Sequence, residues 1–248
     1  VGWSERDMRS MWQTVCATIR KVIADSGVAP SEIKGVSFSA HGKGLYAVDI
    51  NGEPVRNGII SSDNRALPIV REWKSRNVDK AAYPYAFQQV WAGHPVSILA
   101  WLKANEADSY NRIHRVLMAH DWVRYKLTGE FGAEITNISG SNLYNVDTGA
   151  YEPELFKLFG IDEMQECVAP VIGSTESRSG VSAKAADMVG PFRSPKTRSW
   201  EETTLGALVS AIATEHRYQA KIDPELGAIA VPHLDQTAES DMALLTRL

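Results

Sequence analysis

The chain has 248 residues, 44% of them apolar and 23% charged, a composition typical of an ordinary globular protein. Its formal net charge of -4 does not suggest the clustered basic face that nucleic-acid binding needs, so we expect no nucleic-acid partner. No stretch approaches the roughly 18 uninterrupted apolar residues of a membrane helix, and the polar first residues do not resemble a signal peptide. We therefore expect no membrane partner and a cytoplasmic location.

The only two cysteines, Cys16 and Cys167, are far apart and lack a Cys-x-x-Cys partner. This spacing predicts neither a disulfide framework nor a zinc site and favours a reducing compartment. Cys16 falls on the apolar stripe of the first predicted helix, so we interpret it as a small core residue.

Apolar residues recur at helical spacing from Met8 to Ile23, and Gly27 is placed to end that helix. Three strand-like runs follow at 33–39, 45–50 and 55–60. The last two are joined by a turn that contains the Asn51-Gly52 pair. We expect an antiparallel meander packed on the first helix.

Downstream, the periodicity predicts helices over 66–75, 95–105, 122–127 and 153–159, with a short buried strand over 116–118. After these elements the composition changes abruptly.

The stretch GPFRSPKTRS, residues 190–199, is typical of a linker or a seam between segments. Beyond it, residues 200–217 have a helical pattern, and the last thirty residues show no clear pattern.

The segment GVSFSAHGKG, residues 35–44, resembles a phosphate-binding loop only superficially. A Walker-type loop needs Gly-x4-Gly-Lys-Ser/Thr before a helix. Here Ser37 stands where the first glycine belongs, and Lys43 is followed by Gly44 and a predicted strand. We interpret the glycines as a tight crossing between strands.

His41 lies in this segment, and Asp63 and Arg65 follow the neighbouring predicted strand. A lone histidine is more often structural than functional, but at a strand end beside small residues it could reach a polyol hydroxyl. Asp63 and Arg65 would then converge on the same cleft. They could equally form a surface ion pair of little energetic value.

Other chemistries have weaker support. The six histidines include neither His-x-His nor His-Glu-x-x-His, and the chain has no Gly-x-Ser-x-Gly elbow. A metal-dependent hydrolase that uses His41, Asp63 and His94 is therefore the weakest of our hypotheses.

Six blocks carry a resemblance to a known family, the FGGY carbohydrate kinases, and within it to the bacterial branch that acts on L-xylulose. The blocks are GWSERDMRSMWQ, IKGVSFSAHGKGLYAVD, GIISSDNRA, WAGHPVSILAWLKANE, MAHDWVRYKLTGE and NISGSNLYN. They occur in the family's order. The segment from Gly93 to Leu102 approximates the family signature, with Ile98 where the signature prefers Lys.

The resemblance implies an α/β, ribonuclease H-like fold of the actin/hexokinase type, of which this chain holds mostly the N-terminal domain. It implies transfer of the γ-phosphoryl group of ATP, with Mg²⁺, to a hydroxyl of a small sugar, and a ketopentose such as L-xylulose is the expected substrate. By position, Ala40 and His41 resemble the pair that touches the sugar, and Asp63, Arg65 and His94 resemble neighbours of that pocket.

The chain departs from the family pattern in the segments that bind the nucleotide and at the catalytic base. We find no counterpart here of the family's first strand, phosphate loop, catalytic Asp or adenosine loop, so the catalytic base is unknown. Neither Asp187 nor Asp121 plainly takes the place of the catalytic Asp. We expect a kinase N-terminal domain over 1–190, a linker or seam over 191–199 and a C-terminal-domain remnant over 200–248. The alternative to an active kinase is an inactive fragment that at most binds sugar. A homodimer is left open.

Overall fold

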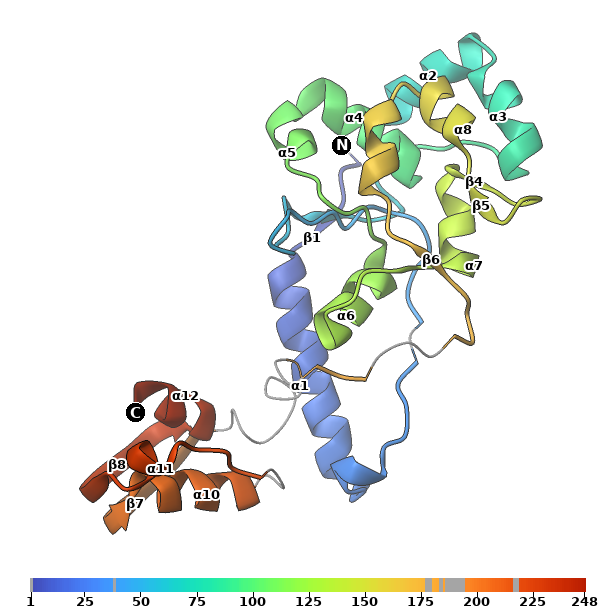
Figure 1. Cartoon of the computed structure of the whole chain (residues 1–248). Helices are drawn as coiled ribbons and strands as arrows, with labels where there is room; N and C mark the ends of the chain where they lie inside the picture. The colour runs from blue at the N-terminus through green and yellow to red at the C-terminus, as the bar shows by residue number, and fades with distance from the viewer. Residues whose placement is uncertain (1, 38, 177–179, 183–184, 186–194, 216–218) are drawn as a thin grey trace. The chain divides into compact units, whose positions relative to one another are not determined.

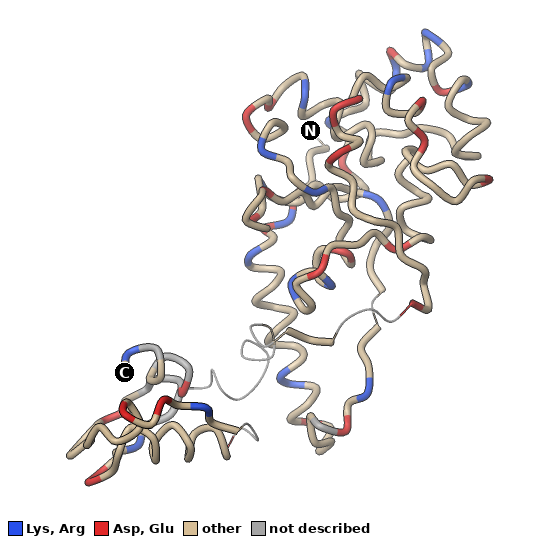
Figure 2. The backbone as a smooth tube through the Cα atoms, viewed as in Figure 1, with Lys and Arg blue, Asp and Glu red and all other residues tan. Residues whose placement is uncertain are grey.

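The computed structural model describes residues 2–37, 39–176, 180–182, 185, 195–215 and 219–248. The chain divides into two compact units, one of residues 1–15 and 33–180, the other of residues 16–32 and 181–248 (Figure 1). Figure 2 shows Lys and Arg interspersed with Asp and Glu along the backbone of each unit.

Short strands form a thin mixed layer in the first unit. Strand β1 (Glu5–Arg6) is antiparallel to β2 (Gly58–Ile59), and Ile59 in turn bridges to Leu45. The layer continues through bridges from Val48 to Arg115 and from Val116 to Val168, the latter parallel. The extended segments from 45 to 48 and from 115 to 118 thus lie at its centre, because each is bonded on both sides.

Two further strand pairs complete this unit. Strand β3 (Ala133–Glu134) is parallel to β6 (Val171–Ile172), whereas β4 (Tyr144–Asn145) and β5 (Ala150–Tyr151) form a short hairpin.

Helices cover this layer and supply most of the core. In chain order they are the start of α1 (Met8–Ser26), α2 (Leu67–Ser75), α3 (Val78–Ala86), α4 (Pro95–Asn105), α5 (Ala107–Asn111), α6 (Ala119–Thr128), α7 (Ile135–Ile138) and α8 (Pro153–Leu158), with 3-10 turns at η2 (Ser139–Ser141) and η3 (Asp162–Cys167). The rest of α1, from Cys16, and the 3-10 turn η1 (Pro30–Glu32) belong to the second unit. Helices α2, α3 and α8 lie together (Figure 1). Trp73 of α2 packs on Phe159 with ring centroids 4.7 Å apart, which joins α2 to the end of α8.

The second unit contains a two-stranded antiparallel sheet with helices against it. Strand β7 (Pro195–Thr204) pairs with β8 (Ala230–Ser240), and α10 (Leu205–Glu215), α11 (Pro224–Gly227) and α12 (Asp241–Arg247) complete it. Its small core includes Leu208, Ile212 and Leu244. Arg198 connects the elements, because it contacts Glu215 at 2.7 Å and Asp241 at 2.5 Å.

The predicted helices are largely confirmed. The first ends at Ser26, before Gly27 at φ +67°, and α4 has the predicted bounds because Pro95 occupies its first turn. Cys16 is buried, as predicted, and neither Cys16 nor Cys167 is part of a disulfide. In the parts that the structure describes, no helix is both long and apolar enough to cross a membrane.

Other predictions are wrong. Apart from Phe38, which lies outside the described residues, 33–39 contains no strand; the meander is reduced to β2 and isolated bridges. Residues 200–204 are strand rather than helix. Residues 195–199 also belong to β7, because they pair across to β8, and the seam predicted over 191–199 stays a prediction. The remaining linker residues 190–194, the last predicted helical residues 216–217, and Asp187 lie outside the described residues.

Candidate functional site

The turn that carries His41 is fixed by its backbone. Lys43 and Gly44 both have left-handed backbone angles, with φ of +65° and +76°. A Cβ on Gly44 would lie 2.6 Å from the carbonyl oxygen of Ile59, so only glycine fits this crossing. Gly44 donates a hydrogen bond to the Gly93 carbonyl at 3.0 Å. The predicted close crossing between segments is confirmed.

His41 is exposed at the outer side of this turn, and Ala40 is exposed next to it. The Nε2 of His41 lies 3.0 Å from the hydroxyl of Tyr46, a buried residue of the central layer. Burial raises the pKa of Tyr46, so its hydroxyl stays protonated and can donate to the imidazole. The other ring nitrogen, Nδ1, lies 3.4 Å from the Gly42 carbonyl oxygen, so both contacts orient a ring that remains exposed.

His94 approaches the same turn from the start of α4. A Cβ on Gly93 would lie 1.9 Å from the Ser61 carbonyl oxygen, so the Gly93 backbone lies directly against that segment. His94 is only 2% exposed, and its Nδ1 has no hydrogen-bond partner among the described residues. Burial, reinforced by the positive charge of Lys43, lowers the pKa of His94 to about 3, so its ring is neutral at pH 7.

Lys43 and Trp91 connect these two segments. The Lys43 ammonium lies 5.1 Å from the centroid of the Trp91 ring, a cation–π contact, and the Trp91 and His94 rings are 5.3 Å apart. Trp91 is 54% exposed, although large aromatic side chains usually bury most of their area.

A third element, the turn η2, lies beside Lys43. A Cβ on Gly140 would lie 3.8 Å from the Lys43 Nζ, and one on Gly42 would lie 3.4 Å from Oδ1 of Asn137. Gln88 donates to the Ser139 carbonyl at 2.5 Å, which attaches η2 to the segment preceding Trp91. We call the residues His41, Lys43, Trp91, His94 and Asn137 the candidate cluster.

Asp63 and Arg65 form a buried ion pair with each other. Both side chains are 0% exposed, and Nε of Arg65 contacts Oδ1 of Asp63 at 2.9 Å. Asp63 also accepts from the Ser4 amide, and Arg65 reaches Glu5 at 2.7 Å. These bonds hold the pKa of Asp63 below its usual range even though its burial acts in the opposite direction.

The Arg65 guanidinium also lies between two indoles, 4.5 Å from the Trp3 ring centroid and 5.1 Å from that of Trp101. The interpretation as a surface ion pair is therefore wrong, because the pair is fully buried. The Asp63 carboxylate is bonded to Arg65 and to the backbone of Ser4, so it fastens the N-terminal segment to the end of β2.

Of the five predicted site residues, the structure places His94 near Lys43, leaves Ala40 and His41 exposed in the turn that precedes Lys43, and pairs Asp63 with Arg65. Whether Asp63 and Arg65 also reach a sugar stays a prediction. The sequence patterns do not single out Trp91 or Asn137. A signal for Trp91 exists, since it stands two residues before Gly93 in one of the six family-like blocks.

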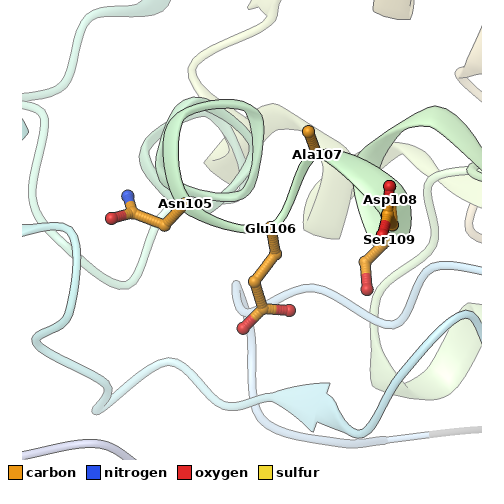
Figure 3. A pocket seen from close by; sticks show the side chains of 5 residues that line it. All are labelled: Asn105, Glu106, Ala107, Asp108 and Ser109. Carbon is orange, nitrogen blue, oxygen red and sulfur yellow. The ribbon is translucent and has the colours of Figure 1, made fainter.

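A shallow hollow among the described residues lies elsewhere. A depression of about 360 Å³ is lined by Asn105, Glu106, Ala107, Asp108 and Ser109 (Figure 3). It is at the C-terminal end of α4, about 16 Å along the helix from His94 at 1.5 Å per residue. Glu106 there forms an ion pair with Arg56. None of the predicted site residues lines it.

The sequence profile of the N-terminal domain of the FGGY family of carbohydrate kinases matches residues 1–195. The chain belongs to this family. An L-xylulose/3-keto-L-gulonate kinase of Escherichia coli strain K12 is 45% identical over 189 residues, which are 76% of this chain and 38% of that protein. The chain thus spans less than half the length of the kinases it matches.

The fold prediction is confirmed by a solved structure, a ligand-bound xylulose kinase from Lactobacillus acidophilus. It superposes with a TM-score of 0.70 at 20% identity, over 77% of this chain and 38% of that one. The first unit therefore has the ribonuclease H-like fold of actin- and hexokinase-type ATPases.

A relative of another kind also matches. A probable baseplate hub protein of Escherichia phage P2 is 43% identical over 90 residues, 36% of this chain and 22% of that protein. The phage protein is named as a baseplate component and not as a sugar kinase.

Proposed function

We propose that this chain supplies the sugar-binding part of a carbohydrate kinase that transfers the γ-phosphoryl group of ATP to a sugar hydroxyl. Membership of the FGGY family supports the reaction class. The observation that carries the sugar site is that Lys43, two residues after His41, lies over the Trp91 ring, which in turn lies beside His94. An exposed indole offers a face for the C–H groups of a sugar, and imidazoles offer hydrogen bonds to its hydroxyls.

The proposed substrate is a ketopentose such as L-xylulose or a related keto sugar acid. The named activity of the E. coli relative, on L-xylulose and 3-keto-L-gulonate, supports this class. His94 fits such a substrate, because a neutral ring with an unpartnered Nδ1 can accept from a hydroxyl without repelling a cation nearby. Ala40 leaves space beside His41, and Asp63 and Arg65 support the segment that Gly93 lies against.

ATP and Mg²⁺ are part of this proposal but are assigned to no residue. Among the described residues, no group of three His, Cys, Asp or Glu side chains lies close enough to hold a metal ion. Phosphoryl transfer needs a metal-bound nucleotide and a base together. The residues of the candidate cluster therefore do not fit Mg-ATP, and we derive no transfer step through it. Their role is to bind and orient the sugar.

Two measurements test this function. A coupled assay with ATP, Mg²⁺ and L-xylulose reports phosphoryl transfer, and calorimetry reports sugar binding whether or not the chain turns over. His41→Ala should weaken L-xylulose binding several-fold, since it removes a hydrogen-bonding group. His233→Ala, which changes an exposed histidine of the second unit, is the matched control. Equal affinities for both variants and the unchanged chain would remove His41 from the site.

Binding without turnover would favour the inactive-fragment alternative over an active kinase. A stoichiometric transition metal in the purified protein would instead favour the metal-dependent hydrolase. Light scattering tests the open prediction of a homodimer.

We propose a second function for the second unit, because the kinase family profile ends at residue 195. The match to a baseplate hub protein spans 90 residues, more than 195–248 alone can hold, and we infer that it includes the second unit as an assembly module of separate origin rather than the kinase C-terminal remnant that the sequence suggested. The β7–β8 sheet with its own core supports independent folding.

Differential scanning calorimetry separates these two interpretations of the second unit. The assembly module should unfold in its own transition, which Arg198→Ala lowers because it removes contacts to Glu215 and Asp241. ADP should leave that transition unchanged. A rise with ADP would support the kinase remnant instead.

A further inference from the structure

Lys43 adopts a backbone conformation that is unfavourable for lysine, and its charge has no protein partner in the described part of the chain. Its φ of +65° lies in the left-handed region, which glycine and asparagine adopt more readily than lysine. Among the residues that the structure describes, its ammonium makes no hydrogen bond or ion pair, and its contact is with the Trp91 ring. The turn thus holds a partly exposed cation at a fixed place without neutralising it.

The side chains and backbone groups that the structure places against this cation are uncharged. His94 is uncharged at pH 7, and Asn137 and the turn η2 present amide and backbone groups. The carboxylate of Glu134 is turned to other partners, since it accepts from the amides of Thr136 and Asn137. A cation among neutral polar groups attracts an anion more strongly than one that is already paired.

His94 provides an independent indication of a ligand. Its side chain is almost fully buried, yet its Nδ1 has no partner in the described part of the chain, although buried polar atoms nearly always have one. The ring lies beside Trp91, whose other contact is the Lys43 ammonium. A ligand that satisfies His94 and lies against the indole would therefore be close to the cation.

We propose that Lys43 is a specificity-determining residue that binds the carboxylate of a keto sugar acid, while the rest of the candidate cluster binds the polyol shared with a neutral ketopentose. This inference rests on the proposed sugar-binding function. A neutral sugar gains little from the ammonium, whereas a carboxylate gains a charge-assisted hydrogen bond. Lys43 thereby favours the binding of sugar acids over that of neutral sugars, although both classes of substrate share their hydroxyl groups.

The test is calorimetry on the full chain with two ligands, L-gulonate as a stable sugar acid and L-xylulose as the neutral sugar. Lys43→Gln should weaken L-gulonate binding by about tenfold or more and change L-xylulose binding by less than about twofold. Lys43→Arg keeps the charge and should retain L-gulonate binding. Lys80→Gln makes the same charge change at an exposed position of α3 and should alter neither affinity.

Several outcomes would overturn this inference. Equal losses for both ligands in Lys43→Gln would indicate a structural role for Lys43, and unchanged L-gulonate binding would remove it from recognition. If the unchanged chain binds L-xylulose but not L-gulonate, only the inference fails. If it binds neither, the proposed function fails as well. In an added titration with inorganic phosphate, a loss in Lys43→Gln confined to phosphate binding would assign the cation to a phosphoryl group instead of a carboxylate.

Discussion

Replacing Arg65 by methionine should destabilise the first unit severely. The side chain is fully buried, and the substitution removes its contacts with Asp63 and Glu5 while keeping most of its apolar volume. Asp63 would remain 0% exposed, with only the backbone amides of Ser4 and residue 65 to bond its carboxylate. Leaving one partner of a buried ion pair uncompensated costs about 3–5 kcal/mol.

Urea denaturation measures this loss as the change in the free energy of unfolding of the first unit. The matched control is Arg76→Met, which removes an exposed pair with Glu72, where Arg76 is 66% exposed. Such a pair contributes only about 0.3–0.5 kcal/mol. If Arg65→Met costs less than about 1 kcal/mol, Asp63 is not held by this pair and the structural interpretation is refuted. A variant that stays stable but loses L-xylulose binding would instead assign Arg65 to the sugar.

Two further predictions concern the same framework. Gly93→Ala should prevent folding of the turn or reduce sugar binding strongly, because its Cβ would lie 1.9 Å from the Ser61 carbonyl. Gly173→Ala, with ordinary contacts of 3.7 Å or more to Glu176, is the control for both melting temperature and calorimetry. The free energy of unfolding should fall as the pH drops below about 4, because Asp63 has a lower pKa in the folded chain and the unfolded chain takes up its proton first. Asp63→Asn should flatten this acid limb in a pH series of thermal melts, and an unchanged limb would contradict the assignment.

The helices can be predicted where local signals and burial agree. The α4 bounds follow from Pro95 and an apolar run, and Gly129 ends α6 in the left-handed conformation that glycine favours. Helix α3 escapes sequence-based prediction because Pro84 stands inside it, where proline normally interrupts a helix. Strand β7 escapes it because Pro195 and its charged neighbours suggest a linker, whereas pairs such as Trp200 opposite Leu234 depend on a strand more than thirty residues away.

The candidate site is only partly accessible from the sequence. His41 and His94 can be singled out from their glycine-rich neighbours, and the structure places His94 near Lys43, two residues after His41. The burial of Asp63 with Arg65 cannot be predicted from an Asp-x-Arg spacing, since the same spacing occurs in solvent. That burial depends on Trp3 and Trp101, which lie far apart in the sequence.

The backbone of Lys43 has a consequence for variants chosen by heat resistance. Glycine or asparagine would relieve the strain at φ +65°, a saving of about 1 kcal/mol. A screen for thermal stability alone should therefore accumulate these residues at position 43 and lose the ammonium over Trp91. Selection for thermostability would then favour glycine or asparagine at position 43, whereas selection for anion binding would favour lysine. A screen should therefore select for both properties.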